Sequence, residues 1–220
     1  MARVIVLCCL LLNCLGNQLL AEPIKIGLNY PRTGNYKDEG LELRRGALLA
    51  VEEINHAGGV LGRPLELLSE NTASRAAQAG DNVDRFADQG ARMVFGGATS
   101  EEAMAAGQRA RERGLLYFAT LSYANEVTGQ AGQRYLFRES NSAWMSARAL
   151  GQELTKSLPG KRYFYVTADY TWGWTQEESI KNATEAQGWK TVNAVRTRLT
   201  DGCCASRTVI PHCHHCPDPT

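Results

Sequence analysis

The sequence predicts an α/β fold in which a doubly wound parallel sheet forms a first lobe and an incomplete second α/β lobe follows it. Apolar strand-like stretches alternate with amphipathic helical stretches, and short glycine-containing joints connect them. After residue 140 a polar connector interrupts this alternation, and a shorter set of the same units follows. At 220 residues the chain has room for two such lobes.

The first lobe is expected over residues 22–140. Its first strand is the β-branched, apolar stretch 24–28, and a helix with an apolar face follows and ends at Gly58 and Gly59. That face consists of Leu43, Ala47, Val51 and Ile54, at spacings of four, four and three residues. Further strands are expected at residues 65–68, 92–95, 115–118 and 135–137, with apolar helical stripes at Ala76, Ala79, Val83 and Phe86 and at Ala103, Ala106 and Ala110, and a short helical turn at residues 124–128.

The second lobe is expected over residues 141–199. A helical stripe is broken by Pro159 and Gly160, and residues 163–166 form a strongly β stretch. An aromatic-rich loop is predicted at residues 168–174, before another helix that ends at Gly188 and a last strand within residues 189–198. This lobe is predicted to be incomplete, because a stable sheet generally needs more than two strands.

The N-terminus predicts a signal peptide over residues 1–21. Arg3 supplies a positive charge, residues 4–12 are apolar and uncharged, and a cut is expected between Ala21 and Glu22. The apolar run is short for a membrane span. We therefore expect export to the periplasm or another extracytoplasmic space.

The last residues differ in composition from the body of the chain. Of seven cysteines, three lie in the predicted signal peptide and four lie after residue 202, so the body is not a disulfide scaffold. The final stretch contains Cys213, His214, His215 and Cys216, which are residue types that zinc prefers, but their spacing matches no usual zinc pattern. We expect residues 200–220 to be an aberrant, unstructured tail and predict no metal site.

Composition and motifs argue against several classes of function. A net charge of +1 with dispersed charges favours no nucleic-acid partner. No dinucleotide fingerprint or phosphate loop occurs, Ser100 lacks the glycines of a nucleophile elbow, and His56 is the only histidine of the body. We therefore expect neither an enzyme nor a bound cofactor.

The stretch 94–102 is the strongest candidate for a binding site. It runs from a short strand through small residues into a helix start, where Thr99 and Glu102 fit a capping box and Ser100 is an equally good cap. Free backbone N–H groups and the helix dipole at such a junction attract an anion, and Ser100 adds a hydroxyl. The alternative is an ordinary strand–helix junction with only a structural role.

Two tryptophans of the predicted loop 168–174 allow two interpretations. Trp172 follows a strand at the edge of a cleft, where a flat ring could cover a bound small molecule, or it could simply pack against its neighbours. For Trp174 we favour packing against Tyr170 or the adjacent helix.

The order of these motifs resembles the periplasmic substrate-binding proteins of the branched-chain amino acid ABC transporter family, which have the type I periplasmic-binding-protein fold. The resemblance covers roughly residues 24–199. It rests on the motifs at residues 24–27, 33–34, 46–59, 96–100, 114–120, 138 and 169–173, of which the Ala-Val-x-x-Ile-Asn-x-x-Gly-Gly type of segment at residues 50–59 is the most specific.

The resemblance implies a set of ligand-binding residues. In that family the positions of Ala98 and Ser100 hold the ligand's carboxylate, the positions of Leu121 and Tyr123 receive its amino group and carboxylate, and an aromatic residue at Trp172 closes from the other lobe. Leu121 and Tyr123 are bulkier than the residues often found there, so a different ligand is plausible.

The resemblance also implies a function and a partner. The expected role is that of an extracytoplasmic solute-binding component of an ABC importer, a monomer that captures an amino acid or related small carboxylate or amide between two lobes and delivers it to an ABC permease in the membrane. The alternative is a ligand-sensing domain of a receptor or regulator with the same fold, which a membrane-spanning or DNA-binding segment would mark. Because the resemblance stops near residue 199, our hypothesis is a truncated or frameshifted member whose binding is impaired.

Overall fold

The computed structural model describes residues 22–158 and 160–198. The predicted signal peptide at residues 1–21 and the predicted tail at residues 200–220 lie outside the described residues. The elements of the first half are β1 (Ile24–Tyr30), α2 (Lys37–His56), β2 (Leu65–Asn71), α3 (Ala76–Asp88), β3 (Met93–Gly96), α4 (Ser100–Arg113), β4 (Leu116–Ala119), η1 (Asn125–Val127) and β5 (Leu136–Arg138). Those of the second half are α5 (Ala143–Ser157), β6 (Arg162–Ala168), α6 (Thr171–Glu185) and β7 (Lys190–Thr197).

The first half forms one parallel five-stranded sheet in the order β2-β1-β3-β4-β5. The chain moves outward from β1 to β2 on one side and then returns to place β3, β4 and β5 on the other. The strand order therefore reverses between β1 and β3, and in open sheets of this kind ligands bind beyond the carboxyl ends of the strands at such a point. The predicted doubly wound sheet is confirmed.

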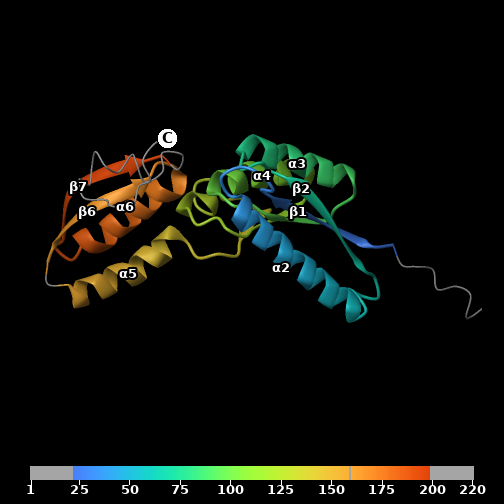
Figure 1. The fold of residues 1–220 in the computed structure, drawn as a ribbon, viewed down its shortest axis with the longest axis horizontal. Coiled ribbons are helices and arrows are strands. Elements are labelled where there is room, and N and C mark those ends of the chain that lie inside the picture. Colours follow the sequence, from blue (N-terminus) through green and yellow to red (C-terminus); the bar gives the residue numbers. More distant parts are fainter. Residues whose placement is uncertain (1–21, 159, 199–220) are drawn as a thin grey trace, which may run out of the picture.

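Helices α3 and α4 cover one face of this sheet, and α2 lies on the other (Figure 1). The core lies under α3 and α4, where Val83, Phe86, Val94 and Tyr117 are fully buried. Gly27 of β1 makes room for this packing, because a Cβ atom there would lie 2.9 Å from the ring of Phe86.

Helix α2 is fixed to the sheet at both ends. Near its start, Gly40 allows a close approach, since a Cβ atom there would lie 1.9 Å from the carbonyl oxygen of Pro31. Near its end, the side chain of Asn55 donates to the carbonyl of Leu65 at 2.9 Å and accepts from the N–H of Leu65 at 2.7 Å. The asparagine of the most specific motif therefore attaches the end of α2 to the start of β2.

The second half is a smaller α/β unit, beside the first along the long axis of the molecule (Figure 1). Its two strands, β6 and β7, are parallel, α6 packs on them, and α5 packs on α6. No helix within residues 22–158 and 160–198 is long and apolar enough to cross a membrane.

One prediction for this half is wrong. The stretch 168–174 was expected to be a loop, but α6 begins at Thr171, so Trp172 and Trp174 belong to its first turn. One long-range contact and one local contact explain the early start. The N–H of Thr171 finds an acceptor in Glu101 of the first lobe, and Gly173 lets the helix lie against the end of β6, where a Cβ atom would be 2.0 Å from the carbonyl oxygen of Ala168.

Candidate functional site

The candidate site lies where β3 and β4 end and their following segments meet. Gly96 and Gly97 turn the chain out of β3 with φ angles of 140° and 86°, in the region that favours glycine. A Cβ atom on Gly96 would lie 1.9 Å from the carbonyl oxygen of Asn29, so the turn requires glycine there. This tight turn places Ala98, Thr99 and the start of α4 beside the residues that follow β4.

The start of α4 is capped as predicted, with Thr99 as the cap. Its hydroxyl accepts from the N–H of Glu102 at 3.1 Å. In a capping box the carboxylate of Glu102 would accept from the N–H of Thr99. Here it accepts instead from the N–H of Ala98 at 2.8 Å and from the hydroxyl of Thr72 at 2.9 Å. Ala98 lines the site, yet its N–H group already has an acceptor.

The Glu102 side chain is fully buried beneath the loop that it supports. Burial raises the pKa of this carboxyl, while the hydrogen bonds from Ala98 and Thr72 act in the opposite direction. The buried carboxyl group of Glu102 therefore stabilises the loop before α4 through its hydrogen bond to Ala98, in addition to any apolar packing.

Ser100 is the first residue of α4 and is almost completely buried. Its Oγ accepts from the N–H of Ala124 at 3.1 Å, which leaves the hydroxyl hydrogen free to donate elsewhere. Within the described part of the chain, the N–H groups of Thr99, Ser100 and Glu101 donate to no other residue. These donors and the positive end of the α4 dipole together suit an anionic group.

A cavity of about 220 Å³ opens directly above these donors. All five residues predicted from the sequence, Ala98, Ser100, Leu121, Tyr123 and Trp172, line it. The structure therefore brings together residues from three separate segments of the chain.

The cavity also has lining residues that were not predicted from the sequence, namely Tyr36, Glu39 and Tyr170, together with Thr99, which was predicted only as a helix cap. Tyr36 directly precedes α2 and Glu39 lies in its first turn, and neither the apolar spacing of that helix nor a recognised motif singled them out. Tyr170 comes just after β6 and had been considered only as a packing partner.

Aromatic rings from both lobes form the walls of the cavity. The rings of Tyr123 and Trp172 have centroids 6.4 Å apart, and those of Tyr170 and Trp172 are 6.0 Å apart. Burial raises the pKa of Tyr36 and that of Tyr170, and the charges of Glu101 and Glu39 raise both further. Both phenols therefore remain protonated at neutral pH.

A hydrogen bond between the lobes borders the cavity. The N–H of Thr171, the first residue of α6, donates to the carboxylate of Glu101 in α4 at 2.9 Å. A carboxylate at a helix N-terminus is favoured by the helix dipole. This contact holds Trp172 of the second lobe over the residues of the first.

Trp174 is 42% exposed, and its packing against Tyr170 or the adjacent helix stays a prediction. Its indole N–H donates to Asp169 at 3.0 Å, and the guanidinium of Arg196 lies 5.7 Å from the centre of its ring. It does not line the cavity.

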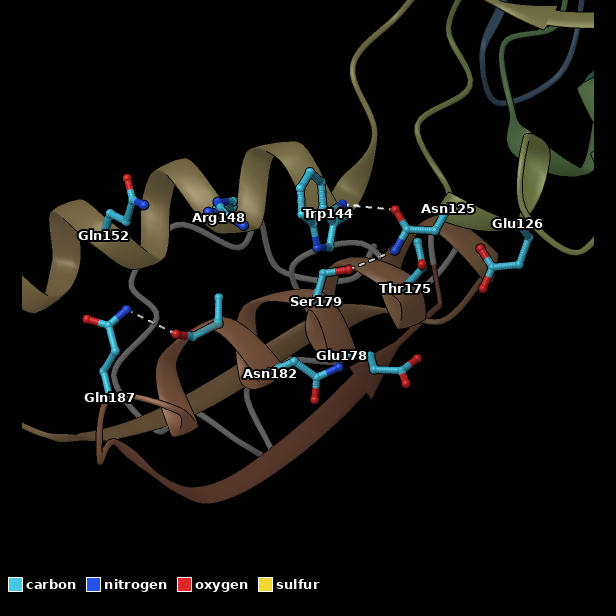
Figure 2. Close-up of a pocket in the computed structure, with 11 residues that line it drawn as sticks. Asn125, Glu126, Trp144, Arg148, Gln152, Thr175, Glu178, Ser179, Asn182 and Gln187 are labelled. Atoms are coloured by element: carbon cyan, nitrogen blue, oxygen red, sulfur yellow. Dashed lines mark hydrogen bonds between the residues drawn. The ribbon is translucent and has the colours of Figure 1, made fainter.

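A second and larger cavity of about 540 Å³ lies between η1, α5 and α6 (Figure 2). There the side chain of Asn125 accepts from the N–H of Trp144 and donates to the hydroxyl of Ser179, each at 2.9 Å. None of the predicted residues lines this cavity, and helices rather than strand ends form its walls. The smaller cavity therefore remains the candidate site.

The family model described as periplasmic binding protein matches residues 23–202. The chain belongs to the periplasmic binding protein family. The predicted family is thus confirmed, and the match extends through both lobes described above.

Two relatives of this periplasmic binding protein place it near the branched-chain amino acid type. The "Leu/Ile/Val-binding protein homolog 4" of Brucella abortus is 26% identical over 181 residues, which cover 79% of this chain and 44% of the relative. A substrate-binding protein of an ABC transporter from Desulfitobacterium hafniense, solved with leucine, is 27% identical with a TM-score of 0.66, covering 80% of this chain and 51% of that one.

A third comparison supports the fold alone. The branched-chain amino acid transporter substrate-binding protein of Streptococcus pneumoniae, solved with isoleucine, has a TM-score of 0.76 at 24% identity and covers 86% of this chain and 54% of that one. This periplasmic binding protein spans about half the length of the relatives that it matches.

Proposed function

We propose that the protein captures a small carboxylate, an amino acid or a close relative of one, outside the cytoplasm for an ABC importer. One observation carries the proposal: a cavity of about 220 Å³ opens onto the N-terminus of α4 and is closed by aromatic rings of the second lobe. Its volume is below the range of roughly 300–1,000 Å³ for drug-sized ligands, and suits a ligand of about amino-acid size.

The ligand's carboxylate is assigned to the N-terminus of α4. The Ser100 hydroxyl and the N–H groups of Ser100 and Glu101 supply donors that have no protein acceptor among the described residues. Hydrogen bonds to a charged group contribute roughly 1.5–3 kcal/mol each. Ala98 contributes the wall of the site rather than a donor, because its N–H is bound to Glu102.

The ligand's amino group is assigned to the segment after β4. The carbonyl of Leu121 accepts from no described residue, and the N–H of Tyr123 donates to none, whereas the N–H of Leu121 and the carbonyl of Tyr123 are both engaged. One free acceptor and one free donor thus lie on the wall beside the carboxylate donors. This pairing suits the ammonium and carboxylate groups of an amino acid.

Delivery to a membrane permease is the remaining part of the proposal. The first lobe supplies the polar groups and the second supplies Tyr170 and Trp172, so ligand binding favours the closed arrangement of the lobes. A hinge closure of this kind is a signal that a permease can recognise. The name of the relative from Desulfitobacterium hafniense supports the role with an ABC transporter, and the description of the family supports the extracytoplasmic location.

The proposal is tested by ligand binding to the purified protein. Thermal-shift and calorimetric titrations use leucine, isoleucine, arginine and benzoate at neutral pH, and at least one of them is expected to raise the melting temperature. The proposal fails if none of these compounds binds.

A substitution then tests the site itself. Ser100→Ala is expected to weaken carboxylate binding about 10- to 100-fold, because it removes one charge-assisted hydrogen bond. Ser157→Ala, at the exposed end of α5, is the matched control and should bind as the unmodified protein does. Equal affinity in the Ser100 and Ser157 variants would remove Ser100 from the site.

A further inference from the structure

The described residues that line the candidate cavity carry negative charge only. Glu39 is the only charged side chain among the described residues that line it, and the others are apolar, hydroxylic or aromatic. The cavity thus contains a negative charge with no positive side chain on its wall.

Glu39 is also without an ionic partner. It lies in the first turn of α2, where it is exposed to solvent, and no lysine, arginine or histidine in the described residues forms an ion pair with it. Its neighbour Glu42, by contrast, pairs with Arg45 of the same helix. A carboxylate that lines a cavity and has no cation of its own favours a ligand that supplies one.

The aromatic residues of the cavity favour the same kind of ligand. Four of its lining residues, Tyr36, Tyr123, Tyr170 and Trp172, carry aromatic rings. The face of an aromatic ring attracts a cation, and a planar guanidinium also stacks on it. Aliphatic ligands gain only apolar contact from such walls.

A second carboxylate strengthens the negative field. Glu101 lies beside the cavity, where its side chain accepts from Thr171, and its charge reaches the phenols of both Tyr36 and Tyr170. A ligand with a second negative group would therefore meet two carboxylates and no compensating cation.

Building on the function proposed above, we propose that Glu39 and the surrounding aromatic rings make this cavity selective for an amino acid that carries a second positive charge on its side chain, besides its α-ammonium group. The ligand's carboxylate lies at the N-terminus of α4, and its cationic group lies between the rings and Glu39. Arginine has this combination of groups. Branched aliphatic amino acids lack the second charge, and benzoate lacks any positive charge.

Arginine and citrulline test this selectivity directly, because they have nearly the same shape and differ in the charge of the terminal group. Calorimetric titration of the purified protein is expected to show arginine binding roughly 5- to 30-fold more tightly than citrulline. Glu39→Gln should reduce this ratio to about 2-fold or less, because it removes the carboxylate while keeping the shape of the side chain.

Glu42→Gln is the control, since it makes the same change of charge on the same helix outside the cavity. It should leave the ratio of arginine to citrulline affinity unchanged. Comparing two ligands on each variant also separates selectivity from any general loss of stability.

Three results would overturn the inference. If leucine or citrulline binds as tightly as arginine, the proposed function stands and the selectivity is wrong. If Glu39→Gln and Glu42→Gln change the arginine-to-citrulline ratio equally, Glu39 does not set it. Absence of binding by every compound would overturn the proposed function together with the selectivity.

Discussion

The two faces of the five-stranded sheet are packed in different ways. On the face under α3 and α4, Val83, Phe86, Val94 and Tyr117 are completely inaccessible to solvent. On the opposite face, α2 is the only helix among residues 22–158 and 160–198 that covers the sheet, and a hollow of about 880 Å³ remains between them. The same strands therefore supply both a close-packed core and a loosely covered apolar surface.

The loosely covered face also carries a row of stacked aromatic rings. Phe95, Phe118 and Phe137 occupy matching positions on β3, β4 and β5, with ring centroids 4.9 Å and 5.4 Å apart. Phe137, at the edge of the sheet, is 45% exposed. We conclude that the cost of changing a side chain here depends more on the face it occupies than on its residue type.

The largest expected difference compares one phenylalanine from each face. Phe86→Ala should lower the free energy of unfolding by about 3–5 kcal/mol, because it leaves a cavity in the packed core. Phe137→Ala should lower it by less than about 1.5 kcal/mol, since much of that ring already contacts water. Urea denaturation measures both values, and similar losses would show that the two faces contribute equally.

The next difference concerns enlarging an alanine on each face. Ala106 of α4 is completely buried in the core, so Ala106→Leu should destabilise the protein by about 1–3 kcal/mol through overpacking. Ala47 of α2 lines the hollow, so Ala47→Leu should cost less than about 0.5 kcal/mol or stabilise slightly by adding apolar contact. If both substitutions destabilise to the same extent, the hollow closes in solution.

The smallest expected effect concerns the acid buried on the packed face. Because burial raises the folded-state pKa of Glu102, its contribution to stability is complete below the unfolded value of about 4.3 and is lost as the pH rises through the folded value. The unfolding free energy of the unmodified protein should therefore fall, relative to that of Glu102→Gln, as the pH is raised from 4 toward neutral.

Denaturation curves of both proteins across this pH range measure the difference, and other titrating groups cancel because both proteins contain them. A constant difference would mean that the hydrogen bonds from Ala98 and Thr72 fully offset the cost of burial.

Local sequence patterns predicted most of the fold, and the comparison of the two sheet faces shows which features they could not predict. The apolar spacing of Leu43, Ala47 and Val51 correctly indicated the side of α2 that faces the sheet. It could not indicate how completely that side is covered, because coverage depends on what else packs there. The start of α6 was missed for a similar reason, since the acceptor for Thr171 is Glu101, 70 residues earlier in the chain.

The candidate site shows the same limit. Ser100 and the segment after β4 could be placed beside each other, because parallel strands end at one edge of a sheet. Glu39 and Tyr170 could not, because their approach to the cavity depends on the angle of α2 and on the contact between the lobes. The roles of all nine lining residues remain predictions for binding experiments.

Four consecutive residues at the start of α4, from the cap Thr99 to Glu102, have four different roles. Thr99 caps the helix, Ser100 lines the cavity, Glu101 contacts the second lobe, and Glu102 supports the loop from within the core. Successive residues of a helix point about 100° apart, so each task depends on the position of its residue along the turn. A substitution in this turn affects one task, whereas inserting or deleting a single residue would misdirect all four at once, so this turn should be the part of the chain least tolerant of a change in length.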